Sequence, residues 1–178
     1  MTTLPNLSQE LNSILDISEM PKDVNVAPSW TAYFLLSPYD AATVGQVLPE
    51  PLESLLERRY HSSPILISSA STDSFEGALR YSSGPAKRST YQNDLIENHI
   101  RSENLWDSFI LKIETDNVYL VRDPEDFLVL VVPMGCSLIE ELGGVSLILE
   151  INELIFESGL TGFSRDELDR FNRIFNRL

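Results

Sequence analysis

Two segments in the first third of the chain place apolar residues at helical spacing. In the first, apolar residues at positions 7, 11, 14 and 15 form one face of a helix that Asn6 is suited to cap. Pro21 should end this helix, because the residue before a proline avoids the helical region. The second segment follows Pro51, which the first turn of a helix tolerates. Its predicted buried face consists of Leu52, Leu55, Leu56 and Tyr60.

Short runs rich in aromatic and branched residues predict strands on either side of the second helix. SWTAYFLLSP (29–38) is such a run, and Pro38 is expected to end it. SPILISS (63–69) and GALRYSS (77–83) predict two strands of a hairpin or wide loop, joined by STDSFE. SSGPAKRST (82–90) has the composition of a flexible segment. It leads into a predicted helix over about 91–106, which Ser89 or Thr90 can cap.

The strongest strand pattern covers residues 109–132. FILKIE, NVYLVR and DFLVLVV are separated by the turn-like sequences TD and DPE, which predicts a three-stranded antiparallel meander. In the first strand, apolar residues at 109, 111 and 113 alternate with Lys112 and Glu114, so one face should be solvated. The third strand is apolar on both faces, and we expect it to be central and covered on both sides.

The stretch GGVSLILEINELIFESG (143–159) fits two different periods. With period two, alternate apolar residues point one way, as in a strand. With period 3.6, Glu150, Glu153 and Glu157 share one face of a helix, and this pattern continues to the last of them without conflict. Gly159 is then a natural glycine at the C-terminal end. We therefore predict a helix over about 145–157 with the three glutamates as its solvated stripe.

The C-terminal segment carries the clearest helix signal in the chain. Ser164 and Glu167 form the S-x-x-E pattern of a capping box, and Phe163 precedes it as a candidate hydrophobic staple. Apolar residues then stand at positions 168, 171, 175 and 178. This spacing predicts an amphipathic helix that docks on another apolar surface.

Together these elements predict an α+β fold. The chain of 178 residues suits one domain (1–178), in which an antiparallel sheet with the central meander packs against helices. The single cysteine, Cys136, excludes an intramolecular disulfide and suits a reducing compartment. The N-terminal residues lack the basic and apolar regions of a secretory signal, and no apolar run is long enough to span a bilayer. We therefore expect a cytoplasmic protein that does not bind a membrane.

The charge of the chain is unusual and unevenly distributed. The formal net charge is −14, from 27 acidic and 13 basic residues. Residues 58–122 contain eight residues of each sign, whereas residues 123–164 contain eight acids and no Lys or Arg. Such a field repels nucleic acid and attracts cationic surfaces. A solvated surface that only keeps the protein soluble is an equally good interpretation of the charge.

Few residues suggest catalytic or cofactor chemistry. His and Cys are too scarce and too far apart for a zinc site, the acidic turn 123–126 lacks an EF-hand pattern, and we expect neither a metal nor a cofactor. Cys136, with His61 or His99, is the only candidate for nucleophilic catalysis, although a lone Cys in apolar company is more often a packing residue. The segment GPAKRST can bind an anion, but it lacks the spacing of a nucleotide-binding loop.

The composition favours an interaction protein over an enzyme. Immunity proteins and antitoxins that neutralise basic toxins share its general character, which is acidic, single-domain and without a catalytic motif. The hypothesis is a non-enzymatic inhibitor of a cationic protein, and no nucleic acid is expected as a partner. The alternatives are a small enzyme of unknown type and a subunit of a larger assembly. The candidate partner-binding residues are Asp123, Glu125, Asp126, Glu140, Glu141, Glu150, Glu153 and Glu157.

Overall fold

A computed structural model describes residues 3–18, 23–37, 48–105, 108–123 and 127–176. The helices are α1 (Leu7–Ile14), α3 (Leu52–Tyr60), α4 (Asn93–Ser102), α5 (Leu138–Leu142), α6 (Gly144–Glu157) and α7 (Arg165–Phe175). The strands are β1 (Leu15–Ser18), β2 (Val24–Val26), β3 (Trp30–Leu36), β4 (Pro64–Phe75), β5 (Ala78–Ser83), β6 (Lys87–Thr90), β7 (Phe109–Ile113), β8 (Val118–Asp123) and β9 (Phe127–Pro133). The predicted α+β class is confirmed.

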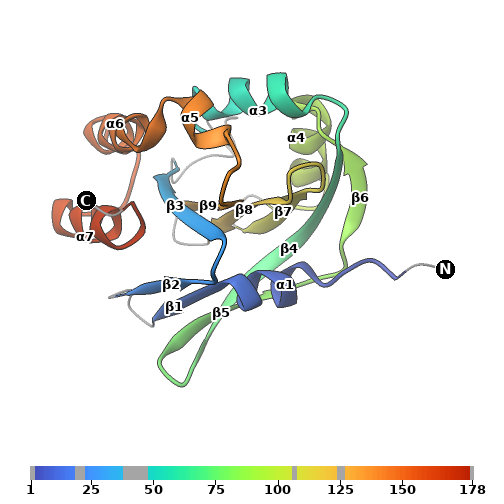
Figure 1. Ribbon diagram of the computed structural model, residues 1–178, viewed down its shortest axis with the longest axis horizontal. Coiled ribbons are helices and arrows are strands. Elements are labelled where there is room, and N and C mark those ends of the chain that lie inside the picture. The colour runs from blue at the N-terminus through green and yellow to red at the C-terminus, as the bar shows by residue number, and fades with distance from the viewer. Residues whose placement is uncertain (1–2, 19–22, 38–47, 106–107, 124–126, 177–178) are drawn as a thin grey trace.

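A single curved antiparallel sheet organises the molecule (Figure 1). Its order is β2-β1-β5-β4-β7-β8-β9-β3, and β6 pairs with β4 outside this path. The predicted meander is present as β7, β8 and β9, with registers such as Leu111↔Leu120 and Leu120↔Leu130. Because β2 at one end of the order also contacts β3 at the other end, the sheet nearly closes on itself.

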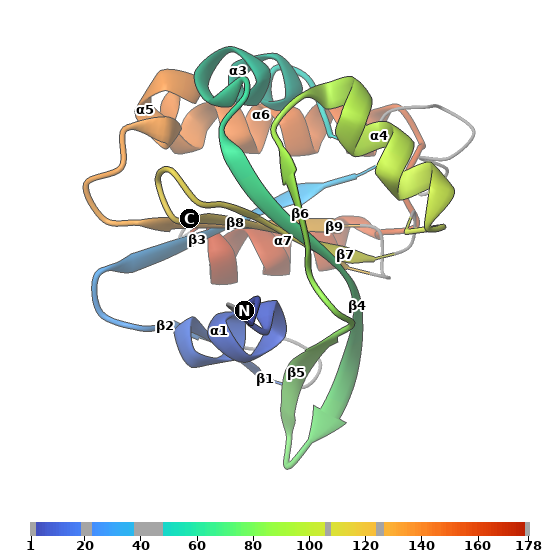
Figure 2. The same cartoon turned by 90° about the vertical axis from the view of Figure 1, so that its right-hand side faces the viewer.

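Two apolar cores lie on the two faces of this sheet. One core joins α3, α4, α5 and α6 to one face, and the other joins α1, β1 and α7 to the opposite face (Figure 2). Strand alternation divides the residues between the cores, so Phe109 and Leu111 belong to the first and Ile110 to the second. β9 is buried along both faces, as the sequence predicted. It lies between β8 and β3 in the sheet.

The prediction that one face of the first meander strand is solvated was wrong. Helix α1 covers this face, so Ile110 is fully buried and the Lys112 side chain is only 16% exposed. The Lys112 ammonium donates a hydrogen bond of 2.9 Å to Glu10 on α1, and the Tyr119 hydroxyl donates one of 2.5 Å to the same carboxylate. The charged side chain that suggested solvent exposure therefore forms an ion pair beneath a helix.

The first helix is shorter than its apolar spacing predicted. The Asn6 side chain caps α1 by accepting a hydrogen bond from the Gln9 N–H, as expected, but the helix ends at Ile14. Leu15, which we assigned to the helical face, begins β1 and pairs with Val26. Pro21, the predicted end of the helix, lies outside the described residues. The sequence pattern also missed β2, a strand of three residues.

The long strand β4 changes the prediction for residues 63–90. β4 and β5 form the expected hairpin, but STDSFE is mostly strand and the turn consists of Glu76 and Gly77, both with positive φ. The segment predicted to be flexible contains β6, which pairs with β4 in the register Ile65↔Ser89. β5 and β6 thus pair with successive halves of β4, an arrangement that no local sequence signal indicates.

Helix α4 is also shorter than predicted, and another helix caps it. It begins at Asn93 and ends at Ser102, whereas the prediction was about 91–106. Neither Ser89 nor Thr90 caps it, because both are residues of β6. The Glu57 carboxylate on α3 instead accepts a hydrogen bond of 2.9 Å from the Asn93 backbone N–H. A negative side chain at a helix N-terminus is favourable for the helix dipole.

Helices α6 and α7 cover the open edge of β3 with buried asparagine side chains. The Phe34 N–H donates to Asn176 Oδ1 at 2.9 Å, and the Leu36 N–H donates to Asn152 Oδ1 at 2.8 Å. The amide groups of Asn152 and Asn176 both donate to the Phe34 carbonyl and to Asn172 Oδ1. These bonds satisfy backbone groups that an edge strand otherwise leaves unpaired, and they fix α6 on the molecule.

The C-terminal helix docks internally as predicted. Its capping box is formed by Ser164 and Glu167, and Leu168, Phe171 and Phe175 are buried in the second core. The Phe171 ring lies 5.0 Å from the Phe34 ring, between centroids. This docking removes the apolar surface that would have favoured a subunit of a larger assembly.

Candidate functional site

The structure separates the eight predicted partner-binding acids into different environments. Asp123 ends β8 and is only 3% exposed, with the Tyr81 hydroxyl 3.4 Å from its carboxylate. It is therefore not available on the surface, which corrects its assignment to a binding face. Glu125 and Asp126 lie outside the described residues. The remaining five acids belong to α5 and α6.

The two glutamates of α5 differ in their partners. Glu140 is exposed, whereas Glu141 accepts a hydrogen bond of 2.6 Å from Arg59 Nη1 on α3. The Arg59 guanidinium lowers the pKa of the Glu141 carboxyl. Residues 123–164 contain no base in the sequence, but the fold supplies one from α3. Glu141 is thus partly neutralised within the protein.

Helix α6 presents its three glutamates as predicted, and an exposed leucine lies beside them. Leu154 is 67% exposed. Glu150 precedes it by one helical turn, Glu157 follows it by nearly one turn, and Glu153 is its neighbour in the chain. We call these four residues the α6 acidic face. Helix α6 begins after Gly143 and Gly144, whose φ angles of 122° and 79° separate it from α5.

Arg165 neutralises one side of the α6 acidic face. Its guanidinium forms an ion pair with Glu153 and lies 4.2 Å from the centroid of the Phe156 ring. The hydrogen bond to Glu153 raises the pKa of Arg165. Among the residues that the structure describes, Glu150 and Glu157 form no ion pair, although Glu157 is near enough to Arg165 to raise its pKa. These two carboxylates therefore carry the negative field next to Leu154.

Two shallow hollows lie on either side of Leu154. Leu149, Glu150 and Glu153 line one together with Leu154. The other is lined by Leu154, Ile155 and Leu160 together with Pro49 and Glu50 at the start of α3. An exposed apolar centre with a charged rim has the composition of a protein-binding surface. The sequence predicted the carboxylates but missed the leucine, because only the glutamates were expected on the solvated side of this helix.

Arg59 joins three parts of the structure through charged hydrogen bonds. Its Nε and Nη2 atoms donate to Asp116 Oδ2 at 3.2 and 3.0 Å, and the Tyr60 hydroxyl donates to the same oxygen at 2.7 Å. The hydrogen bond from Tyr60 lowers the pKa of Asp116, and Arg59 lowers it further against the opposing effect of burial. This arrangement ties α3 to the turn between β7 and β8 and, through Glu141, to α5.

Because the pKa of Asp116 is lowered, the free energy of unfolding should decrease at acidic pH. The unfolded chain binds a proton near the ordinary pKa of 3.8, whereas the folded protein binds it only at lower pH. Stability from this group is therefore present above pH 3.8 and is lost as the pH falls through the folded pKa. We expect Asp116→Asn to reduce the loss of stability between neutral pH and about pH 3, measured as urea midpoints. The exposed Asp94→Asn is the control, and an unchanged acid dependence in Asp116→Asn would contradict the expectation.

Comparison with known proteins gives no relative: no family model, curated protein or solved structure matches this chain. The site itself must therefore supply the functional argument. Within the described ranges, no group of three His, Cys, Asp or Glu side chains is placed to hold a metal ion. No helix in that part of the chain is long and apolar enough to cross a membrane.

The residues considered for catalysis are not assembled into a site. Cys136 is half-buried against the first core, and no hydrogen bond links it to His61 or His99 in the described part of the structure. His99 is half-buried, and burial together with the nearby Lys87 ammonium lowers its pKa. In the segment 84–90, Lys87 pairs with Glu103 and Arg88 with Glu114, at 2.6 and 2.8 Å. Both cations are thus occupied by carboxylates and not directed toward an anion.

Proposed function

We propose that this protein is a non-enzymatic interaction protein that inhibits a cationic protein partner, in the manner of immunity proteins and antitoxins. The observation that carries the proposal is the α6 acidic face, where a mostly exposed leucine lies beside three glutamates. A basic partner with an apolar residue at the centre of its surface complements this arrangement in both charge and polarity.

The energetics of such a surface divide between its apolar and charged parts. The net charge of −14 attracts a cation at long range and raises the association rate. Close charge pairs at an interface couple by roughly 1.5–7 kcal/mol. Leu154 adds apolar burial of about 1.5–3 kcal/mol if a partner covers it completely. The glutamates therefore determine mainly the rate of association, and Leu154 the lifetime of the complex.

The proposal can be tested with charge-neutralising substitutions. We expect Glu150→Gln with Glu157→Gln to slow association with the partner, identified by affinity capture, without unfolding α6, since Gln and Glu have similar helix propensity. Wild-type association should also slow steeply between 0.01 M and 0.15 M salt, as the Debye length falls from about 30 Å to about 8 Å. Stopped-flow measurements of the association rate give both quantities.

A matched control removes the same charge far from α6. Asp73→Asn with Glu76→Gln changes the β4–β5 hairpin, which lies at the opposite end of the molecule from α6 (Figure 2). This variant should keep the wild-type rate and salt dependence to within about twofold, because salt screens charges at the opposite end of the molecule from a partner on α6. Equal effects of the two variants, or an acidic partner, would show that the α6 acidic face is only a solvated surface.

A third variant tests the apolar centre. Leu154→Ala should leave the association rate nearly unchanged and increase the dissociation rate, because most interface substitutions of this kind act on dissociation. A complex that dissociates at the wild-type rate would exclude Leu154 from the interface.

A further inference from the structure

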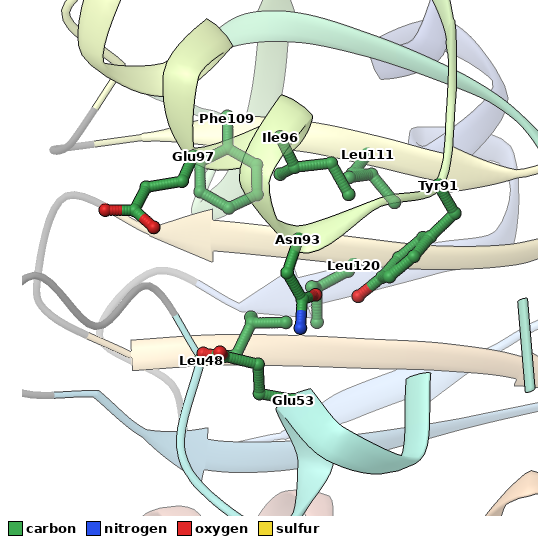
Figure 3. Close-up of a pocket in the computed structure, with 9 residues that line it drawn as sticks. All are labelled: Leu48, Glu53, Tyr91, Asn93, Ile96, Glu97, Phe109, Leu111 and Leu120. Carbon is green, nitrogen blue, oxygen red and sulfur yellow. The ribbon is translucent and has the colours of Figure 1, made fainter. Parts of the chain in front are cut away.

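A small pocket opens between α3 and α4 above strands β7 and β8 (Figure 3). Its apolar wall consists of Ile96, Phe109, Leu111 and Leu120, with Leu48 at one side. The free volume is about 30 Å³, which accommodates roughly two water molecules. The pocket can therefore hold the small polar end group of a ligand, and a narrow stem of the ligand then connects this group to the outside.

The hydroxyl of Tyr91 points into this pocket without a hydrogen-bond partner. Tyr91 is fully buried, and its Oη has no partner in the described residues. The close-up shows this hydroxyl and the Asn93 amide directed into the same space (Figure 3). In contrast, the buried hydroxyls of Tyr60 and Tyr119 donate to Asp116 and Glu10, at 2.7 and 2.5 Å. Because buried polar groups are almost always hydrogen-bonded, the Tyr91 hydroxyl is a candidate contact for a ligand.

Carboxylates make the pocket electronegative. Glu53 on α3 and Glu97 on α4 line it, and Glu50 and Glu57 lie near enough to repel Glu53. Burial raises the pKa of Glu53, and repulsion from these three glutamates raises it further. One cation compensates in part, since Arg101 pairs with Glu97 at 2.8 Å. Glu53 has no such partner within the described part of the chain.

We propose that the pocket binds a primary alkylammonium group. An ammonium ion has three N–H donors and no acceptor, and Tyr91 Oη, the Asn93 side-chain oxygen and the Glu53 carboxylate can all accept. The methylene stem packs on the apolar wall, as lysine stems do on apolar surfaces, and the Phe109 ring favours a cation nearby. A guanidinium carries five donors in a rigid plane, more than these three accepting groups match.

Two sources can supply this chemistry, a lysine side chain of the cationic partner or a free primary amine. The lysine source rests on the proposed function and extends it. Glu50, two residues before α3, lines the hollow beside Leu154, and Glu53 in the first turn of α3 lines the ammonium pocket. A single partner that covers the start of α3 can therefore contact the α6 acidic face and place a lysine in the pocket.

The direct test titrates the wild-type protein with butylammonium and follows backbone amide and aromatic NMR shifts. Saturable shifts should appear at Tyr91, Asn93 and Phe109, and neutral butanol should bind at least about tenfold more weakly, because a hydrogen bond to a charged group is the stronger kind. Tetramethylammonium, which has the charge but no N–H donor, should also bind more weakly. Equal affinities for butylammonium and butanol, or shifts elsewhere on the protein, would overturn the proposal.

Two pocket variants and one control separate binding from folding. Tyr91→Phe and Glu53→Gln should each weaken butylammonium binding by about tenfold, whereas Glu76→Gln at the distant hairpin should not. Tyr91→Phe should keep or raise the melting temperature, since it removes an unpaired hydroxyl, and Tyr60→Phe should lower it, since it breaks the bond to Asp116. A lowered melting temperature in Tyr91→Phe together with unchanged butylammonium affinity would show that the hydroxyl has a structural partner and not a ligand.

Competition with the partner distinguishes the two sources and the two proposals. If butylammonium at saturating concentration weakens partner binding, the lysine source is supported. If butylammonium binds the pocket and the partner is unaffected, the pocket takes a free amine. If a basic partner binds through the α6 acidic face while butylammonium does not bind at all, the pocket proposal fails and the proposed function stands.

Discussion

Removal of residues after Gly162 should abolish cooperative folding, because it deletes α7 from the second core. Leu168, Phe171 and Phe175 are each no more than 3% exposed. The burial of each contributes roughly 1.5–3 kcal/mol, so their loss removes about 4.5–9 kcal/mol from a total that is typically about 5–15 kcal/mol. The truncation also removes Asn172 and Asn176, which bind Asn152 and the edge of β3.

Circular dichroism during thermal and urea unfolding measures this effect. We expect the truncated protein to show no cooperative transition, and the single substitution Leu168→Ala to cost about 2–5 kcal/mol. Arg173→Ala on the exposed side of α7 is the control and should remain within about 0.5 kcal/mol of wild type. A truncated protein that melts at the wild-type temperature would show that α7 is not part of the core.

Asn152→Leu should destabilise the protein although it nearly preserves side-chain size. Asn152 is fully buried and makes three hydrogen bonds, to the Leu36 N–H, the Phe34 carbonyl and Asn172 Oδ1. Leucine can make none of them, and the Leu36 N–H is then left buried without an acceptor. The Phe34 carbonyl and Asn172 Oδ1 keep their donors from Asn176, so one unsatisfied buried N–H remains and we expect a loss of about 1–3 kcal/mol.

Urea midpoints for Asn152→Leu and for the control Asn98→Leu test the role of the asparagine side chains. Asn98 lies on the exposed side of α4, and its replacement should change stability by no more than about 0.5 kcal/mol. The uncovered edge of β3 should also promote association of the destabilised protein, since open strand edges pair with other chains. If Asn152→Leu is as stable as wild type, the hydrogen bonds to β3 contribute nothing net, and the packing of α6 alone covers the edge.

Several elements could be predicted because their signals are local. The cap at Asn6 and the capping box at Ser164 use side chains within three residues of the bonds that they make. The helix at Gly144–Glu157 follows from the 3.6-residue period, and Gly159, with φ of 74°, ends it as predicted. The meander β7–β8–β9 joins neighbouring strands by short turns, so its pairing is also local.

Predictions failed where a distant segment competed with a local preference. Leu15 has helical spacing, but pairing with Val26 and the burial of its side chain in the second core make it a strand residue. Residues 87–90 have a polar composition typical of a loop, yet the free edge of β4 pairs with them. The helix cap from Glu57 comes from 36 residues earlier in the chain. Hydrogen bonds between remote backbone or side-chain groups outweigh propensities that amount to a few tenths of a kcal/mol per residue.

The candidate site divides in the same way. The sequence by itself determined the excess of acids, the absence of bases from residues 123–164, and the helix that presents Glu150, Glu153 and Glu157. Only the tertiary structure decided which of these charges remain free, because Arg59 and Arg165 come from other elements to neutralise Glu141 and Glu153. The burial of the Tyr91 hydroxyl beside Glu53 was likewise decided by the tertiary structure. These two residues are 38 positions apart in the chain and come together where α3 and α4 meet. Charge and periodicity depend on the order of residues, whereas neutralisation and burial depend on distances that the whole fold determines.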